Sequence, residues 1–142
     1  MHRSSARLVS AVLVDASALV ALLDRDDRAH DRCVEALKRL GDPLITVWPA
    51  LTEAMHLLAD TPGVEALCHM VEDQVLALAS LEAADVGRMK ELMRKYRDLP
   101  MDFADAALVR VAERDGLTRV LTFDKHFEIY RLPGRRRLTV LP

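Results

Sequence analysis

Residues 100–127 read PMDFADAALVRVAERDGLTRVLTFDKHF, a helical pattern followed by a strand pattern. Asp102 begins the expected helix, which ends near Gly116, and Asp105 lies three residues after that start. Asp124 directly follows the apolar run 118–123. Three carboxylates therefore stand at the ends of apolar elements, where like charges repel one another. What neutralises them is the first question that the sequence raises.

Apolar runs and helical patterns alternate along the whole chain. Valine-rich or leucine-rich runs predict strands at 9–15, 43–48, 75–80, 118–123 and 136–142. Helical patterns fall between them, at 17–23, 27–42, 49–60, 63–74, 81–96, 102–116 and 124–131. This alternation predicts the α/β class, with a mainly parallel central sheet between layers of helices. The length of 142 residues predicts a single domain over residues 1–142.

The composition narrows the range of functions. Hydrophobic residues make up 51% of the chain, which is enough for a core, whereas aromatic residues make up only 4%. So few aromatics argue against a stacking platform for single-stranded nucleic acid. The net charge of −2 excludes a basic protein but allows a local basic stripe. A run of apolar residues at 8–23 is interrupted by Asp15 and is too short to span a bilayer, so we expect no membrane association.

The two cysteines, Cys33 and Cys68, are far apart and form no C-x-x-C motif. They are interpreted as free thiols in a reducing cytoplasm, which is the expected location of the protein.

Five acidic residues fall where the predicted elements meet. Asp15 and Asp124 end the first and fourth strands, and parallel strands carry such residues to the same edge of a sheet. Asp102 and Asp105, three residues apart, share one helix face near its N-terminus. Glu53 lies about one turn into the helix after the second strand. All five carboxylates are expected to converge on one rim.

Each acid taken alone has a structural explanation. Asp15, Asp102 and Asp124 precede helical stretches and could be N-caps, and Asp102 with Asp105 resembles a loose capping box. Glu53 in a first turn would favour the helix dipole.

The conjunction of the five acids favours a metal site. Two unit charges 5 Å apart repel by about 3 kcal/mol at an effective dielectric constant near 20, so a shared rim calls for a cation. Ligands that are all oxygen suit Mg²⁺ or Mn²⁺, ions that bind phosphates and assist displacement at phosphorus. The sequence therefore predicts chemistry on a phosphodiester. Glu53-x-x-His56 has the spacing of a helical di-iron site, but the second copy that such a site needs is missing.

Four stretches, VLVDASALVALL, LTEAMHLL, MDFADAALVRVAE and VLTFDKHF, together resemble the PIN-domain nucleases. They are most similar to the VapC-like ribonuclease toxins of type II toxin–antitoxin modules, and they occur in the order of that family from about Val9 to the C-terminus. The resemblance implies a PIN-like α/β/α sandwich. It also implies an endoribonuclease that uses Mg²⁺ or Mn²⁺ to hydrolyse RNA phosphodiesters.

The resemblance assigns roles by position. It makes Asp15, Asp105 and Asp124 metal ligands, and Glu53 a residue that helps to hold the metal and orients the attacking water; all four count as catalytic. Asp102 matches a position that varies in the family, and it is kept as a further candidate ligand. Ser17 and Thr122 would supply supporting hydrogen bonds. Ala16 departs from the threonine often found there.

The resemblance also implies partners. RNA is the expected substrate, a small antitoxin the expected inhibitor, and a homodimer the expected assembly, with apolar surface expected around Leu57, Leu58 and Leu67. Basic residues that could guide RNA to an acidic site cluster in two segments, although solvated surfaces explain them equally well; they are Arg88, Lys90, Arg94, Lys95, Arg97, Arg131, Arg135, Arg136 and Arg137.

Two alternatives of another class remain open at this point. One is a receiver-like, phosphate-sensing domain, which also gathers acids at strand ends of a doubly wound sheet. The other is a PIN fold that binds RNA or a protein partner without cutting.

Overall fold

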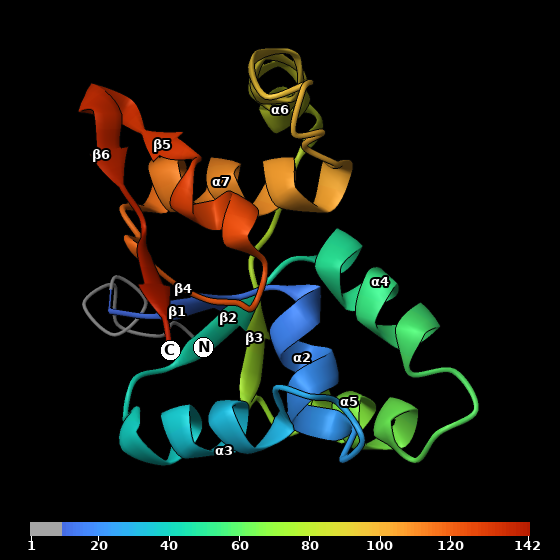
Figure 1. Ribbon diagram of the computed structural model, residues 1–142. Coiled ribbons are helices and arrows are strands. Elements are labelled where there is room, and N and C mark those ends of the chain that lie inside the picture. The colour runs from blue at the N-terminus through green and yellow to red at the C-terminus, as the bar shows by residue number, and fades with distance from the viewer. Residues whose placement is uncertain (1–9) are drawn as a thin grey trace.

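Within residues 10–142, the central sheet is built from five parallel strands. They are β1 (Val12–Val14), β2 (Leu44–Thr46), β3 (Leu76–Leu78), β4 (Arg119–Leu121) and β7 (Thr139–Leu141). In space they follow the order β3-β2-β1-β4-β7 (Figure 1). Leu13 pairs with Ile45 on one side and with Val120 on the other. This is a computed structural model that describes residues 10–142 of the chain.

Six helices of the described residues 10–142 surround the sheet. They are α2 (Ala16–Leu23), α3 (His30–Arg39), α4 (Trp48–Leu57), α5 (Gly63–Glu72), α6 (Ala83–Lys95) and α7 (Phe103–Asp115). In Figure 1, α6 and α7 lie on one side of the sheet and α3 and α5 on the other. A 3₁₀ turn η1 (Lys125–Glu128) leads to a hairpin of β5 (Arg131–Leu132) and β6 (Arg136–Arg137), with the 3₁₀ turn η2 (Pro133–Arg135) at its tip.

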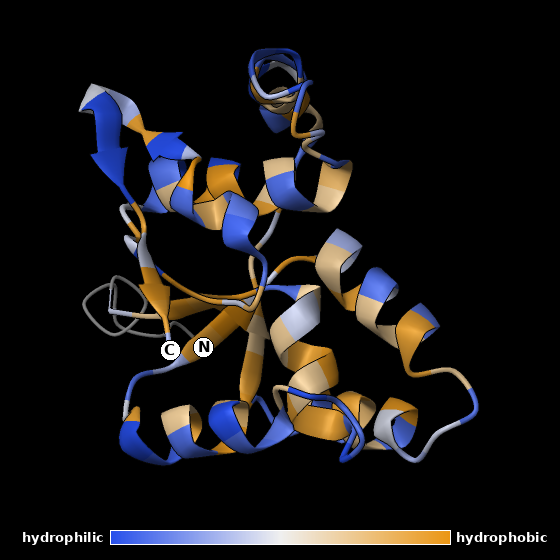
Figure 2. Cartoon of the chain, in the orientation of Figure 1, coloured by the Kyte–Doolittle hydropathy of each residue, from blue (hydrophilic) through white to orange (hydrophobic). Residues whose placement is uncertain are grey.

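Two hydrophobic cores lie on opposite faces of the sheet. Within β1, Leu13 packs into the core that α6 and α7 cover, whereas Val12 and Val14 pack into the core formed with α2, α3 and α5. In β4, Val120 and Leu121 divide in the same way. Figure 2 shows the same pattern, with the central strands hydrophobic and the outer helices striped. A parallel sheet covered on both faces needs such continuous apolar strands, so the predicted α/β/α sandwich is confirmed.

Ion pairs join α6 to α7. Arg110 Nε donates to Asp85 at 2.8 Å, and Arg88 Nε donates to Glu113 at 2.7 Å. The side chains of Asp85 and Glu113 are only 8% and 5% exposed, and each lies against a guanidinium. The arginine neighbours, with a backbone N–H of Glu82, hold the pKa of Asp85 below its usual value.

Several element boundaries differ from the prediction. The strand predicted at 9–15 spans only Val12–Val14, and Val9 lies outside the described residues. The helix predicted from residue 27 starts at His30, because the side chain of Asp27 accepts the backbone N–H of Ala29 and holds a turn there.

The C-terminal segment also departs from the prediction. The single edge strand predicted at 136–142 is divided, since β6 pairs with β5 in a hairpin and only β7 joins the sheet. The hairpin itself was not predicted. Among residues 10–142, no helix is both long and apolar enough to cross a bilayer.

The apolar surface expected around Leu57, Leu58 and Leu67 is mostly absent. Leu58 and Leu67 are completely buried in the core beneath α5, and only Leu57 is exposed, at 57%. The expectation for Leu58 and Leu67 is therefore wrong, because both follow the buried stripe of their helices.

Replacing Leu13 by alanine tests the two-core packing. Leu13 is 1% exposed at the centre of the sheet, so Leu13→Ala should lower the free energy of unfolding by about 2–5 kcal/mol. Val86→Ala on the exposed face of α6 should change it by less than about 0.5 kcal/mol. Urea denaturation measures both, and equal effects would contradict the packing described here.

Candidate active site

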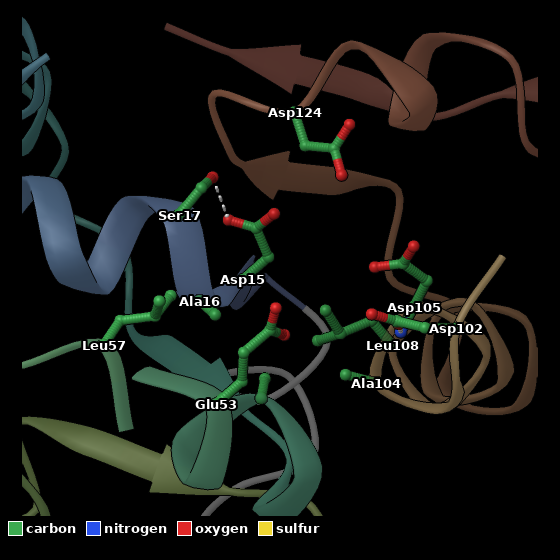
Figure 3. A pocket seen from close by; sticks show the side chains of 11 residues that line it. Asp15, Ala16, Ser17, Glu53, Leu57, Asp102, Ala104, Asp105, Leu108 and Asp124 are labelled. Atoms are coloured by element: carbon green, nitrogen blue, oxygen red, sulfur yellow. Dashed lines mark hydrogen bonds between the residues drawn. The ribbon is translucent and has the colours of Figure 1, made fainter. Parts of the chain in front are cut away.

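The strand order reverses at β1. From β1 the chain continues through β2 and β3 on one side, and then returns to add β4 and β7 on the other. Ligand sites in open parallel sheets form at such a reversal, beyond the carboxyl ends of the strands. A cleft of about 110 Å³ lies there and is lined by Asp15, Ala16, Ser17, Ala50, Glu53, Leu57, Asp102, Ala104, Asp105, Leu108 and Asp124 (Figure 3).

Asp15 is the most buried acid in the cleft, with 5% exposure. It caps α2 by accepting the backbone N–H of Ala18 at 3.1 Å. Its Oδ1 also accepts from Ser17 Oγ at 2.7 Å, and its Oδ2 from Thr122 Oγ1 at 2.6 Å. Burial raises the pKa of Asp15 by more than these hydrogen bonds lower it, so the net shift is upward.

Ser17 and Thr122 link Asp15 to the loop after β4. Each hydroxyl donates to Asp15 and accepts a backbone N–H, from Phe123 to Ser17 Oγ and from Asp124 to Thr122 Oγ1, both at 2.9 Å. Because a hydroxyl has only one proton, the single donor of each side chain is committed to Asp15 in this arrangement. The position of Asp124 is thereby tied to that of Asp15 through backbone hydrogen bonds.

Asp102 and Asp105 lie at the start of α7. Asp102 is the N-cap, and its Oδ1 accepts the backbone N–H of Asp105 at 2.8 Å. Asp105 extends into the cleft, where its Oδ2 accepts a hydrogen bond from the phenol of Tyr130 at 2.9 Å. Burial, followed by the charge of Asp102, raises the pKa of Asp105 to about 7.

Glu53 reaches the same cleft from α4 (Figure 3). It is the sixth residue of a helix that begins at Trp48, so it lies beyond the first turn and the dipole explanation does not apply. Burial, and then the charges of Asp102, Asp15 and Asp124, raise its pKa.

Asp124 completes the acidic lining of the cleft. It caps η1, where its Oδ1 accepts the backbone N–H of His126 at 2.9 Å. The structural explanation from the sequence is therefore correct for three acids, Asp15, Asp102 and Asp124, which are all N-caps. The same three still line one cleft with Glu53 and Asp105.

The acids of the cleft differ in their partners from three other acids of residues 10–142. Asp85, Glu113 and Asp42 each pair with an arginine. Within residues 10–142, no lysine or arginine forms an ion pair with any acid of the cleft, and the nearest basic group is His126, 3.5 Å from Asp124. The local negative charge is thus left without a protein counter-ion.

The donor chemistry of the cleft fits a hard divalent cation. Carboxylate oxygens are the ligands that Mg²⁺ and Mn²⁺ prefer, and the residues that line the cleft include no thiolate or imidazole. No three acidic, histidine or cysteine side chains of the described part of the chain are already grouped around one point as a metal site.

The basic residues suggested by the sequence lie outside the cleft lining. Arg88 is engaged by Glu113 and Glu91, so it is not free to contact a phosphate. Lys95 lies over the ring of Tyr96, 5.3 Å from its centroid. The remaining candidates with exposed side chains are Lys90, Arg94, Arg97, Arg135, Arg136 and Arg137.

Tyr130 is a residue near the site that the sequence did not indicate. It is completely buried, packs edge-to-face on Tyr96 and Phe127, and contacts Asp105 only because the segment after Asp124 folds back onto α7. Burial and the neighbouring acids raise the pKa of Tyr130, so the phenol stays a hydrogen-bond donor. A lone tyrosine in a sequence gives no signal of such a contact.

Comparison with known proteins gives one consistent result. A sequence profile of the PIN domain matches residues 12–132. Ribonuclease VapC26 of Mycobacterium tuberculosis is 30% identical over 135 residues, which cover 92% of this chain and 100% of that protein.

Two solved structures share the fold. VapC20 of M. tuberculosis, described as a sarcin-ricin loop cleaving toxin, superposes with a TM-score of 0.73 at 20% identity, covering 80% of this chain and 90% of that one. VapBC2 of Rickettsia felis, bound to a DNA fragment from its promoter, gives 0.62 at 12% identity, covering 93% and 99%. The strand order β3-β2-β1-β4-β7 also differs from the order 2-1-3-4-5 of receiver domains, which removes the receiver-like alternative.

The stability of the metal-free protein should depend on pH through Asp105. The pKa of Asp105 is about 7 in the folded protein and 3.8 in the unfolded chain. Between pH 3.8 and 7, the carboxyl is therefore protonated mainly in the folded state. Lowering the pH from 8 to 5 in EDTA should therefore raise Tm, and Asp105→Asn should reduce that rise.

Thermal unfolding at several pH values measures this effect. Asp73→Asn, an exposed acid that precedes β3 at the opposite edge of the sheet, is the control and should keep the wild-type dependence. A rise in Tm that is the same in Asp105→Asn would contradict the assigned environment of Asp105.

Proposed function

Because the chain belongs to the PIN-domain family, we propose that it is a ribonuclease that needs Mg²⁺ or Mn²⁺ to hydrolyse RNA phosphodiesters. One observation carries the proposal: a cleft at the reversal of the sheet is lined by carboxylates that have no lysine or arginine partner among residues 10–142. Such a cleft attracts a divalent cation and, with it, the phosphate group that the cation binds.

The residues of the cleft divide the work by position. Asp15, Asp105 and Asp124 would hold the cation, and Glu53 would help to hold it and orient the attacking water. Asp102, one of whose oxygens caps α7, would contribute charge and at most one free oxygen. The bound cation would lower the pKa of water and stabilise the charge that develops on the phosphate.

Ser17 and Thr122 act through Asp15. Their hydroxyls fix both of its oxygens, so the carboxylate keeps one orientation while RNA binds and leaves. Restricted ligands of this kind reduce the reorganisation that the site needs at the moment of reaction.

We further propose that the protein is a toxin with a small antitoxin as its partner. The support is its similarity to ribonuclease VapC26 over the full length of that protein, and the shared fold with the toxin VapC20. A cytoplasmic location and a homodimer complete the proposal. A PIN fold that binds RNA without cutting is the alternative, and the complete set of acids in the cleft favours cutting.

A cleavage assay tests the proposal directly. Purified protein should cut a mixed single-stranded RNA in Mn²⁺ or Mg²⁺ but not in EDTA. Asp15→Asn and Asp105→Asn should lower the rate by more than about 100-fold, since loss of an outer partner alone typically costs 10- to 100-fold.

Asp73→Asn is the matched control and should cut at the wild-type rate. RNA binding without metal-dependent cleavage would favour the non-cleaving alternative. Cleavage that persists in EDTA would contradict the role of the cation.

RNA affinity should depend on salt through the hairpin tip. Arg135 and Arg136 are exposed there, and each phosphate contact contributes about 0.7 to the slope of log K against log salt for single strands. In the Asp105→Asn background, replacing both by glutamine should reduce the slope by about 1.4.

Arg88→Gln provides the comparison, because its guanidinium is paired with Glu113. It should lower stability and leave the salt slope unchanged. Fluorescence anisotropy at several salt concentrations measures these slopes, and an unchanged slope in the hairpin variant would remove the tip from the RNA-binding surface.

A further inference from the structure

We propose that Tyr130 is a positioning residue for Asp105, and that its buried phenol fixes one carboxylate oxygen so that the other is directed to the cation. The inference rests on the proposed function. It concerns a residue outside the acidic lining, which acts on the site through Asp105 alone.

The geometry of the contact carries the argument. Tyr130 Oη donates to Asp105 Oδ2 at 2.9 Å, and this is the hydrogen bond that the structure gives to the Asp105 carboxylate. Asp105 Oδ1 lies without a donor among the described residues and belongs to a side chain that lines the cleft. A carboxylate held by one oxygen can offer the other to a cation in a single orientation.

The phenol is itself held rigidly. The ring of Tyr130 is 0% exposed and packs edge-to-face on Tyr96, with centroids 5.0 Å apart, and on Phe127, at 5.2 Å. Edge-to-face contacts of this kind fix the orientation of a ring in addition to burying it. The hydroxyl is therefore held in one orientation, directed to the start of α7.

Tyr130 also fixes the spacing between two acids of the cleft. Asp124 caps η1, and Tyr130 follows the end of that turn, where its backbone N–H donates to His126 O at 3.2 Å. The short segment from Asp124 to Tyr130 is thus anchored to Thr122 at one end and to Asp105 at the other. Tyr130 thus links α7 to the loop after β4, just as Ser17 and Thr122 link β1 to β4.

Tyr96 supplies a matched control within the same aromatic cluster. Its hydroxyl accepts the backbone N–H of Arg131 at 3.0 Å and has no contact with an acid of the cleft. Tyr96→Phe and Tyr130→Phe therefore remove the same atom from neighbouring rings, and only the second removes a contact to Asp105.

The experiment measures Mn²⁺ binding by calorimetry and RNA cleavage by the full chain. Tyr130→Phe should weaken Mn²⁺ binding about tenfold, within the range typical of outer hydrogen-bond partners, and lower kcat with little change in KM for RNA. Tyr96→Phe should keep Mn²⁺ affinity and kcat within about twofold of wild type. In an Asp105→Asn background, Tyr130→Phe should have no further effect on Mn²⁺ affinity, because the two residues act as one unit.

The outcomes separate this inference from the proposed function. If wild type binds Mn²⁺ and cuts RNA, and Tyr130→Phe has the same Mn²⁺ affinity and kcat, the role of Tyr130 alone is overturned. Wild type that neither binds Mn²⁺ nor cuts RNA would overturn the proposed function. A loss of Mn²⁺ affinity that is equal in Tyr96→Phe would also overturn the inference, since it would report a general effect of the cluster.

A second measurement does not depend on the folding of a variant. In NMR spectra of the wild-type protein, the hydroxyl proton of Tyr130 should be protected from exchange with water, and its resonance should shift when Mg²⁺ is added. Rapid exchange, or a resonance that Mg²⁺ leaves unchanged, would overturn the inference.

Discussion

The buried carboxylate of Asp15 joins the two halves of the sheet where the strand order reverses. Its oxygens accept from Ser17 on the α2 side and from Thr122 at the end of β4, and both hydroxyls accept backbone N–H groups of the loop that carries Asp124. A buried carboxylate is costly unless it is hydrogen-bonded in this way. These bonds fix the relative positions of β1, α2 and β4, and the other acids of the cleft lie around Asp15.

Capping and site chemistry use the same residues in this protein. Asp15, Asp102 and Asp124 each cap a helical element with a backbone N–H bond, and each also lines the cleft. In Asp102 and Asp124 only one carboxylate oxygen accepts the capping hydrogen bond, whereas in Asp15 the second oxygen accepts from Thr122. The N-terminal ends of helices carry partial positive charge, so they also reduce the repulsion among acids gathered there.

The distribution of ion pairs separates structural acids from those of the cleft. Asp85 and Glu113 are nearly buried and hold α6 against α7 through three arginines. Asp105 is partly buried and Glu53 is exposed on α4, but the charged neighbours of both are other carboxylates, and desolvation with this repulsion raises the pKa of both. Within residues 10–142, arginines pair with Asp85 and Glu113, whereas none pairs with an acid of the cleft. This contrast separates the acids that hold α6 against α7 from those that line the cleft, and it supports the proposed cation site.

The sequence by itself determined the order of the elements, the parallel sheet and the edge at which the acids gather, because hydrophobic periodicity and the ends of strands are local properties of the chain. The α/β/α sandwich and the convergence of Asp15, Glu53, Asp102, Asp105 and Asp124 on one cleft follow from that order. The tertiary structure alone decided the β5–β6 hairpin, the burial of Leu58 and Leu67, and the engagement of Arg88 by Glu113. It alone brought Tyr130 to Asp105, residues 25 positions apart. Such contacts depend on how a turn folds back and on which helix faces meet. Neither is a local property of the chain, so the sequence around a side chain does not indicate its tertiary partner.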